Sequence, residues 1–162
     1  MTSHAMRSGR SVSPWLALAG FVVAVALAAL IGGLGVAGTA SEYQSLDRPS
    51  WAPPSSVFGP VWTVLYAMIA VSGWLVWRRT GWSSALNWYA VQLVLNAAWT
   101  PIFFGAGQYG LALLDIVVLW ALIGVTVWKF RAVSKPAAAL LLPYWAWVTF
   151  ATALNAAIWL AN

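Results

Sequence analysis

The sequence predicts an all-α membrane protein, a five-transmembrane-helix bundle with a long first extramembrane loop acting as a lid. Two observations lead to this prediction. Of the 162 residues, 62% are hydrophobic and only 7% are charged, whereas a soluble globular domain carries about 25% charged residues. The apolar residues are also concentrated in five stretches, each close to the roughly 20 residues with which a helix crosses the hydrocarbon core.

The five expected spans are joined by loops of unequal length. The spans run over Trp15–Gly38, Pro60–Trp77, Ala85–Phe104, Leu111–Phe130 and Ala137–Ala161. The later loops are short, so neighbouring helices should pack antiparallel. The first loop, residues 39–59, is long for a compact bundle and is therefore a functional candidate. Residues 1–14 are expected to be a disordered basic tail, which leaves 15–162 as one domain.

The first span has a second interpretation, as a secretory signal. Arg7 and Arg10 precede it, and "VAGTAS" near its end resembles a small-residue cleavage site. The apolar run exceeds the roughly 7–15 residues of a signal core, which favours a retained helix. Ala24, Ala28 and Gly32 would give that helix a stripe of small residues suited to close packing.

Basic residues lie mainly on one side of the expected bundle. With five spans, the tail, the second loop and the fourth loop share a side, which holds Arg7, Arg10, Arg78, Arg79, Lys129, Arg131 and Lys135. The other side holds Arg48, beside Glu42 and Asp47. Because cytoplasmic loops carry an excess of Lys and Arg, we expect a cytoplasmic N-terminus and an outward first loop and C-terminus. Membrane orientation therefore explains the net charge of +5 better than nucleic-acid binding does.

The side-chain inventory excludes several kinds of site. The chain has no Cys and a single histidine, His4, in the tail, so no metal site is expected within the bundle. Asp115 is the only carboxylate within an expected span, and no second one is present to form an acid–base pair. A buried acid in a membrane is a functional candidate. Its place about one turn from the predicted outer end favours a structural role for Asp115, in which it reaches the interface or accepts a hydrogen bond from Tyr109 or Trp120.

The stretch "RPSWAPPSSVFGPVWTVLY" places rigid and aromatic residues before the second span. Pro49, Pro53 and Pro54 should hold the loop extended. Trp62 and Tyr66 are four residues apart and share one helical face. An interfacial aromatic belt would also use tryptophans, but a stiff loop over an aromatic wall is suited to holding a flat ligand at low entropic cost. The residues alone leave both interpretations open.

The third span contains a stripe of polar and aromatic residues in "QLVLNAAWTPIFF". Gln92, Asn96, Trp99 and Phe103 follow helical spacing and share one face. Their amides fit helix–helix hydrogen bonds of about 1 kcal/mol each, or the polar groups of a mainly apolar pocket. Pro101 frees a backbone carbonyl near the same end.

The fifth span carries a comparable face in "PYWAWVTFATALN". Trp147, Ala151 and Asn155 (or Leu154) line it, and Pro143 should bend the helix one turn earlier. A small Ala beneath a Trp leaves room for a flat ligand. Small residues are also what close helix packing requires, and packing is the default interpretation.

These three stretches together resemble the TspO/MBR family, which comprises the bacterial tryptophan-rich sensory proteins and the mitochondrial translocator protein. They fall in the family's order, and the resemblance extends over Trp15–Leu160. It implies a five-helix bundle in a bacterial cell membrane, commonly a homodimer, with a ligand pocket under the first loop. The implied ligands are protoporphyrin IX, haem and related tetrapyrroles, and synthetic isoquinoline carboxamides or benzodiazepines; no obligatory cofactor is implied.

The resemblance also implies which residues form the pocket, and spacing from Trp62 adds Tyr66. The expected ligand-binding residues are Tyr43, Trp51, Pro53, Pro54, Trp62, Tyr66, Asn96, Trp99, Trp147 and Ala151. Ser56 stands where many relatives carry a bulky residue, which would widen the mouth of the pocket.

The leading hypothesis is therefore a membrane receptor that senses or buffers tetrapyrroles. One alternative is light- and oxygen-dependent degradation of protoporphyrin, because the tryptophans tied to it in some bacterial members match Trp62 and Trp147. That reaction would use the porphyrin's own photochemistry, since the bundle offers no conventional catalytic residues. Another alternative is porphyrin transport, although the chain lacks the repeat pair that transporters use. The sterol motif of animal members is absent, because "LNAAIWLAN" contains neither Tyr nor a basic residue.

Overall fold

The computed structural model describes residues 12–36 and 40–162, and within these ranges it contains helices and no strand. The elements are α1 (Pro14–Val36), α2 (Ala40–Ser45), η1 (Ser55–Val57), α3 (Phe58–Thr80), α4 (Ser84–Thr100), η2 (Pro101–Gly105), α5 (Tyr109–Val133) and α6 (Lys135–Ala161). The all-α prediction is confirmed. Residues 1–11 of the expected tail (1–14) and residues 37–38 of the expected first span lie outside the described residues. Pro14, the last residue of the expected tail, begins α1.

Within the described residues, four helical segments are long and apolar enough to cross a membrane, as the hydropathy of the sequence predicts. They are Pro14–Val36, Ser55–Thr80, Tyr109–Val133 and Lys135–Ala161. Their limits lie within a few residues of the expected spans, except that the second begins earlier. The α4 helix has 17 residues, shorter than the predicted span Ala85–Phe104.

The end of α4 differs from the straight helix that hydropathy predicts. Pro101 has no N–H, so the α-helical hydrogen-bond ladder is interrupted there. The chain continues as the five-residue π-helix η2, in which Ala106 N donates to Pro101 O over 2.9 Å. Gly107, with φ of +61°, then turns the backbone into α5, a conformation that favours glycine.

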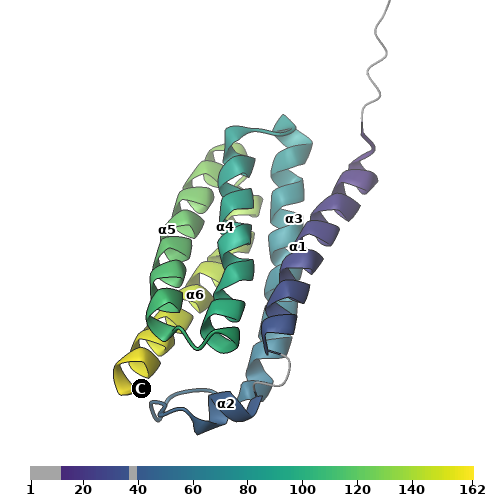
Figure 1. Ribbon diagram of the computed structural model, residues 1–162. Helices are drawn as coiled ribbons and strands as arrows, with labels where there is room; N and C mark the ends of the chain where they lie inside the picture. The colour runs from purple at the N-terminus through teal and green to yellow at the C-terminus, as the bar shows by residue number, and fades with distance from the viewer. Residues whose placement is uncertain (1–11, 37–39) are drawn as a thin grey trace, which may run out of the picture.

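The long helices run alternately up and down and form a closed ring (Figure 1). In the ring, α1 contacts α3 and α4, α6 contacts α3 and α5, and α4 contacts α5. The expected packing of sequence neighbours therefore holds for α4 with α5 and for α5 with α6. Although only residues 81–83 join them, α3 and α4 make few contacts, because α1 lies against both.

Helix α1 packs against the rest of the bundle along one narrow face. Its buried residues are Phe21, Val25, Ala28 and Gly32, whereas Ala24 of the predicted small-residue stripe is exposed. Phe21 fits because Gly73 of α3 has no side chain, and a Cβ there would lie 2.8 Å from both the Phe21 and Tyr89 rings. Ala28 and Gly32 of the predicted stripe are therefore buried, and Phe21 and Val25 rather than Ala24 continue the buried face.

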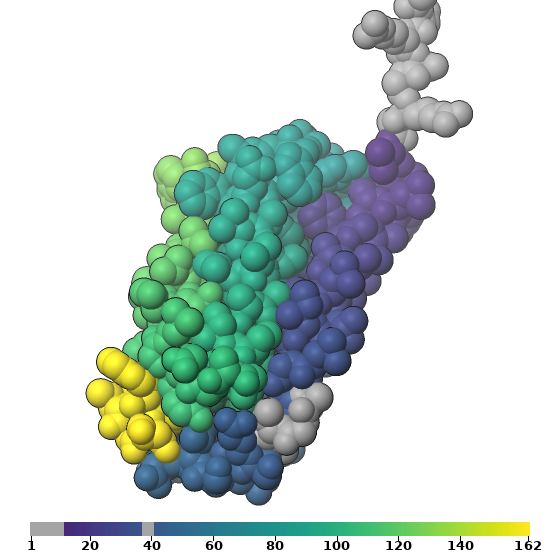
Figure 2. Space-filling model, viewed as in Figure 1, coloured from purple at the N-terminus to yellow at the C-terminus, as the bar shows by residue number. Residues whose placement is uncertain are grey.

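The segment from residue 40 to 57 covers one end of the ring, beside the C-terminus (Figures 1 and 2). The prolines predicted an extended segment. The structure differs, because α2 and η1 form within it. Tyr43 is buried and donates its hydroxyl hydrogen to Pro53 O over 3.1 Å. Asn162 exchanges two hydrogen bonds with the Asp47 backbone, of 3.2 and 3.1 Å. These contacts hold the segment against the helix ends.

Proline 143 does not interrupt α6, which is continuous from Lys135 to Ala161. The helix begins with Ser134 as its N-cap, whose hydroxyl accepts from Ala137 N, as serine commonly does. Because α6 is long and continuous, it reaches from the end of the ring that holds the α3–α4 turn to the covered end (Figure 1).

Candidate functional site

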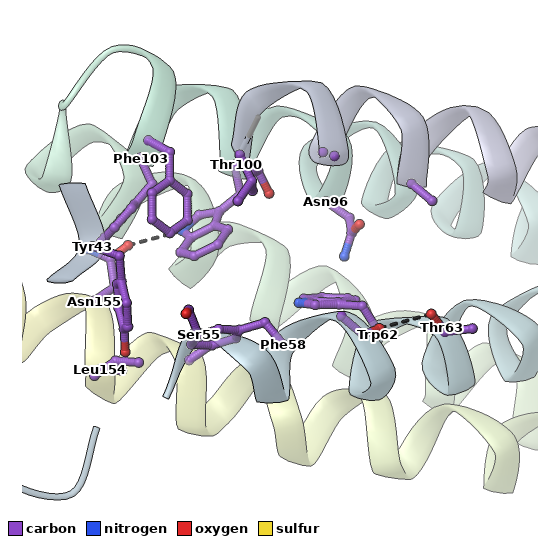
Figure 3. Close-up of a pocket in the computed structure, with 18 of the residues that line it drawn as sticks. Tyr43, Ser55, Phe58, Trp62, Thr63, Asn96, Thr100, Phe103, Leu154 and Asn155 are labelled. Carbon is purple, nitrogen blue, oxygen red and sulfur yellow. Dashed lines mark hydrogen bonds between the residues drawn. The ribbon is translucent and has the colours of Figure 1, made fainter. Parts of the chain in front are cut away.

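A cavity of about 620 Å³ lies at the covered end of the ring, between α1, α3, α4, η2 and α6 (Figure 3). Its lining residues are Ala29, Gly32, Gly33, Val36, Tyr43, Ser55, Ser56, Phe58, Gly59, Trp62, Thr63, Tyr66, Asn96, Trp99, Thr100, Phe103, Phe104, Ala151, Leu154, Asn155 and Ile158. None of these side chains carries a formal charge. The volume falls within the roughly 300–1,000 Å³ of small-molecule sites.

Two stacked aromatic pairs form opposite parts of the cavity wall. On α3, Trp62 and Tyr66 stack with ring centroids 5.2 Å apart and planes at 29°. Trp99 of α4 stacks on Phe103 of η2 at 5.1 Å and 30°. The two residues of each pair are four positions apart in the sequence. Helical spacing therefore places them on one face, as predicted. The π-helical turn keeps Phe103 in line with Trp99 despite Pro101.

Asn96 joins the cavity wall to the interior of the bundle. Its Oδ1 accepts from the Tyr66 hydroxyl over 2.9 Å, and its Nδ2 donates to the Tyr144 hydroxyl over 3.0 Å. Tyr144 in turn donates to Gln92 Oε1 over 2.7 Å. The amide therefore does both things that the sequence left as alternatives: it lines the cavity and bonds α4 to α3 and α6.

A second amide, Asn155 of α6, fixes the other side of the cavity. Trp99 donates from its indole nitrogen to Asn155 Oδ1 over 3.0 Å, and Asn155 Nδ2 donates to the backbone oxygen of Tyr109 over 2.9 Å. Asn155, Leu154 and Ala151 all line the cavity, so both candidates for the end of the predicted α6 face contribute. The bonds hold the Trp99 ring at a defined angle.

Four expected site residues lie outside the lining. Trp51 is half exposed, and the centroid of its ring lies 5.7 Å from that of the Phe150 ring. Pro53 accepts the Tyr43 hydroxyl hydrogen, and Pro54 precedes η1. Trp147 contacts Phe58 at 6.1 Å.

Trp147 lines a much smaller void of about 20 Å³ beside the main cavity. Trp62, Asn96, Trp99 and Ala151 line both spaces. Of the ten expected residues, the structure thus brings six to the cavity: Tyr43, Trp62, Tyr66, Asn96, Trp99 and Ala151. Trp147 lies one layer behind them.

The wall formed by α1 was not predicted from sequence. Ala29, Gly32, Gly33 and Val36 line the cavity, yet small apolar residues in a first span are typical of helix packing. What distinguishes them is their place in the assembled bundle, which their own sequence does not indicate. Other lining residues that the sequence did not predict are Ser55, Phe58, Gly59, Thr63, Thr100, Phe104 and Ile158.

Asp115 lies on α5, away from the cavity lining, and is partly buried. In the described part of the chain its Oδ2 is enclosed without a hydrogen-bond partner. The expected donor Trp120 does not bind it, because the Trp120 indole donates to Thr149 Oγ1 over 2.8 Å. The structure assigns Asp115 no contact with the cavity.

The cavity is therefore suited to a flat, mainly apolar molecule with a few polar atoms. Aromatic faces of Trp62 and Trp99 favour stacking with a conjugated ring system. The amide and hydroxyl groups of Asn96 and Tyr66 are neutral, so they can orient a carbonyl or carboxyl group without a counter-ion. Uncharged walls also favour entry of a ligand that partitions into lipid.

Comparison with known proteins shows extensive similarity. The TspO/MBR family model matches residues 21–160. The human (Homo sapiens) translocator protein is 41% identical over 155 residues, which cover 92% of each chain. The tryptophan-rich sensory protein of Cereibacter sphaeroides is 39% identical over 113 residues, covering 70% of this chain and 72% of its own. The tryptophan-rich protein TspO of Chlorobaculum tepidum is 42% identical over 117 residues, covering 70% and 74%.

Proposed function

Because the chain belongs to the TspO/MBR family, we propose that this integral membrane protein is a receptor that binds tetrapyrroles, protoporphyrin IX or haem, in the cavity. The single observation that supports this most is the uncharged cavity of about 620 Å³ walled by Trp62, Tyr66, Trp99 and Phe103. A macrocycle gains stacking area from such rings, each aromatic pair adding about 0.5–1.5 kcal/mol beyond burial.

The polar part of the wall would orient the ligand. Tyr66 and Asn96 lie together, joined by a 2.9 Å hydrogen bond, and a few convergent polar groups in an apolar pocket typically set orientation. A propionate side chain of the porphyrin would approach this pair while the macrocycle lies along Trp62. Synthetic isoquinoline carboxamides and benzodiazepines fit the same description, since they are flat aromatics that carry a carbonyl group.

The proposed receptor has five transmembrane helices, and α4 and η2 together form the third of these spans in chain order. Residues Ser84–Thr100 and Pro101–Gly105 run on without a break, which gives a combined length near the roughly 20 residues that a span requires. The segment carrying α2 and η1 would act as the lid, with Trp51, Pro53 and Pro54 in the lid rather than in the cavity wall. We further propose that the protein forms homodimers, as the family resemblance implies.

The charged residues support an orientation in a bacterial cell membrane. Arg78, Arg79, Lys129, Arg131 and Lys135 lie at the ends of α3 and α5 and the start of α6, at the end of the ring opposite α2 (Figure 1). Cytoplasmic ends carry such an excess. The cavity and the C-terminus would therefore face outward, and the N-terminus would be cytoplasmic.

A second candidate function is light- and oxygen-dependent degradation of the bound porphyrin. The observation that favours it is the position of Trp62, whose ring lines both the cavity and the void that Trp147 lines. An indole beside a photoexcited porphyrin can donate an electron to it, and the reduced porphyrin can pass that electron to dioxygen. The superoxide formed would oxidise the macrocycle, and an electron from the macrocycle would return to the indole radical, so that the net reaction is oxidation of the porphyrin by dioxygen. In this candidate function Trp62 would act first and Trp147, one layer behind, would resupply it.

Titration of purified protein with protoporphyrin IX, first in the dark without oxygen and then under timed illumination in air, tests both candidates. Saturable dark binding supports the receptor, and its absence contradicts it. Loss of porphyrin absorbance faster than in detergent alone, on top of dark binding, supports the degrading activity. Equal loss with and without protein removes that activity and leaves the receptor.

A further inference from the structure

The end of the ring opposite the cavity carries basic side chains and, among the described residues, no carboxylate (Figure 1). Its basic residues, called the basic end below, are Arg78 and Arg79 of α3, Lys129 and Arg131 of α5, and Lys135 of α6. The chain has three acidic residues. Two of them lie in the covering segment at the other end, and the third lies in the half of α5 nearer to that segment. Acidic side chains of the protein therefore do not neutralise the basic end.

Arg79 is held in place where three helices end or begin. Its Nη1 donates to the backbone oxygen of Val133, at the end of α5, over 2.7 Å, and Lys135 begins α6 two residues later. Both basic side chains are exposed. A guanidinium group has five N–H donors, so Arg79 keeps further donors for a ligand. The two charges therefore lie where the end of α3 meets the turn between α5 and α6.

Tryptophans at the same end indicate the depth of these charges in a membrane. The guanidinium carbon of Arg78 lies 4.7 Å from the centroid of the Trp74 ring, and Lys129 Nζ lies 5.0 Å from that of the Trp128 ring. Trp74 also stacks on Trp15, at the start of α1, with ring centroids 6.3 Å apart. Indole rings at the ends of membrane spans typically lie at the level of the lipid headgroups. The neighbouring charges therefore lie at the level of the lipid phosphates.

We propose that the basic end is a binding site for anionic phospholipids, and that Arg79 and Lys135 together bind the phosphate of one such lipid. The planar guanidinium group of arginine matches two phosphate oxygens at once, and lysine adds a point charge. A zwitterionic headgroup carries its own cation, whereas the headgroup of phosphatidylglycerol leaves the phosphate charge to the protein. Basic groups on the cytoplasmic side of membrane helices are typical sites for anionic headgroups. This inference does not depend on what the cavity binds.

A bound phosphate would add a second link between α3 and the turn that joins α5 to α6. The protein itself makes one such link here, the hydrogen bond from Arg79 to Val133 O. A ligand that binds the folded state alone stabilises that state. Phosphatidylglycerol should therefore raise the thermal unfolding temperature of the protein more than phosphatidylcholine does.

The test measures which lipid the purified full-length protein retains from a mixture. The protein is equilibrated in detergent with equal amounts of phosphatidylglycerol and phosphatidylcholine that have the same acyl chains. Native mass spectrometry then gives the ratio of the two bound lipids. Wild type should retain phosphatidylglycerol in excess. Arg79→Gln and Lys135→Gln should each lower the ratio about fivefold, the effect of one basic residue near a membrane surface.

Arg48→Gln is the matched control, because it removes one positive charge from the covered end of the ring. Arg48 is exposed, and its guanidinium carbon lies 4.6 Å from the centroid of the Tyr43 ring. This variant should retain the wild-type lipid ratio. Lys135→Gln keeps the test decisive if Arg79→Gln does not fold, because no described residue accepts a hydrogen bond from the Lys135 ammonium group.

Four results would overturn the inference. Equal retention of the two lipids by wild type would show that the protein has no anionic site. An unchanged ratio in Lys135→Gln would remove this residue from the site. An equal fall in Arg48→Gln would show that net charge, and not the basic end, selects the lipid. If soluble glycerol phosphate raised the unfolding temperature as much as phosphatidylglycerol does, the site would recognise free phosphate instead of a membrane lipid.

Discussion

Replacement of Asn96 with leucine removes an amide that serves the cavity and the helix packing at the same time. Leucine has a similar size, so the change removes hydrogen bonds and leaves little empty space. The bonds lost are those with Tyr66, of 2.9 Å, and with Tyr144, of 3.0 Å. Because Asn96 is 4% exposed, water cannot fully replace either bond in the variant.

Both stability and affinity should therefore decrease. Two neutral hydrogen bonds at about 0.5–1.5 kcal/mol each give a loss of about 1–3 kcal/mol in the free energy of unfolding. A bond from the Asn96 amide to a charged propionate contributes about 1.5–3 kcal/mol, so the affinity for protoporphyrin IX should fall about tenfold or more.

Thermal unfolding in detergent measures the first quantity, and a dark titration of the folded fraction measures the second. Ser72→Ala is the matched control, since Ser72 is fully buried and bonds α3 to Ala137 O over 2.7 Å, far from the cavity lining. The control should lose stability and keep its affinity. If Asn96→Leu behaves in the same way, the amide serves helix packing alone and its assignment to the ligand is refuted.

Three further predictions concern packing, photochemistry and orientation. Gly35→Ala should lower the thermal unfolding temperature, because the added Cβ would lie 2.9 Å from the backbone nitrogen of Pro101 in η2. Gly20→Ala should not, because a Cβ there meets nothing within 4 Å; equal unfolding temperatures would contradict the close approach of α1 to η2. Trp62→Phe should keep most dark porphyrin binding and suppress the light-driven loss of porphyrin absorbance, while Trp128→Phe changes neither. If both variants bleach the porphyrin as fast as the wild-type protein does, electron donation by Trp62 is excluded. A tag after Asn162 should be accessible from outside intact spheroplasts, and a protected tag would reverse the proposed orientation.

The helices and part of the cavity were predictable because both depend on periodic patterns within single segments. Hydropathy located the spans, and four-residue spacing paired Trp62 with Tyr66 and Trp99 with Phe103 before any tertiary information. The resemblance added Tyr43, whose position depends on the fold of the covering segment. Contacts of this kind are set by the chain between helices, where no simple period exists.

What could not be predicted depends on contacts between segments that are distant in sequence. Gly33 became part of the cavity because of where α1 lies on α3 and α4, which its own composition does not encode. Trp51 and Trp147 carry strong aromatic signals, but Phe150 and Phe58 contact them and the rings lie outside the cavity lining. The π-helix after Pro101 could not be predicted either, because the missing N–H indicates an interrupted hydrogen-bond ladder but not how the chain continues.

Filling the cavity from α1 tests most directly whether it is the tetrapyrrole site. Gly33 lines the cavity and Gly20 lies on the same helix outside it, and a Cβ at either position would meet nothing within 4 Å. Protoporphyrin IX should therefore bind Gly20→Trp with wild-type affinity in a dark titration. Gly33→Trp should bind about tenfold or more weakly, because the added ring takes volume that the ligand needs. Equal affinities in wild type, Gly20→Trp and Gly33→Trp would mean that the porphyrin binds elsewhere.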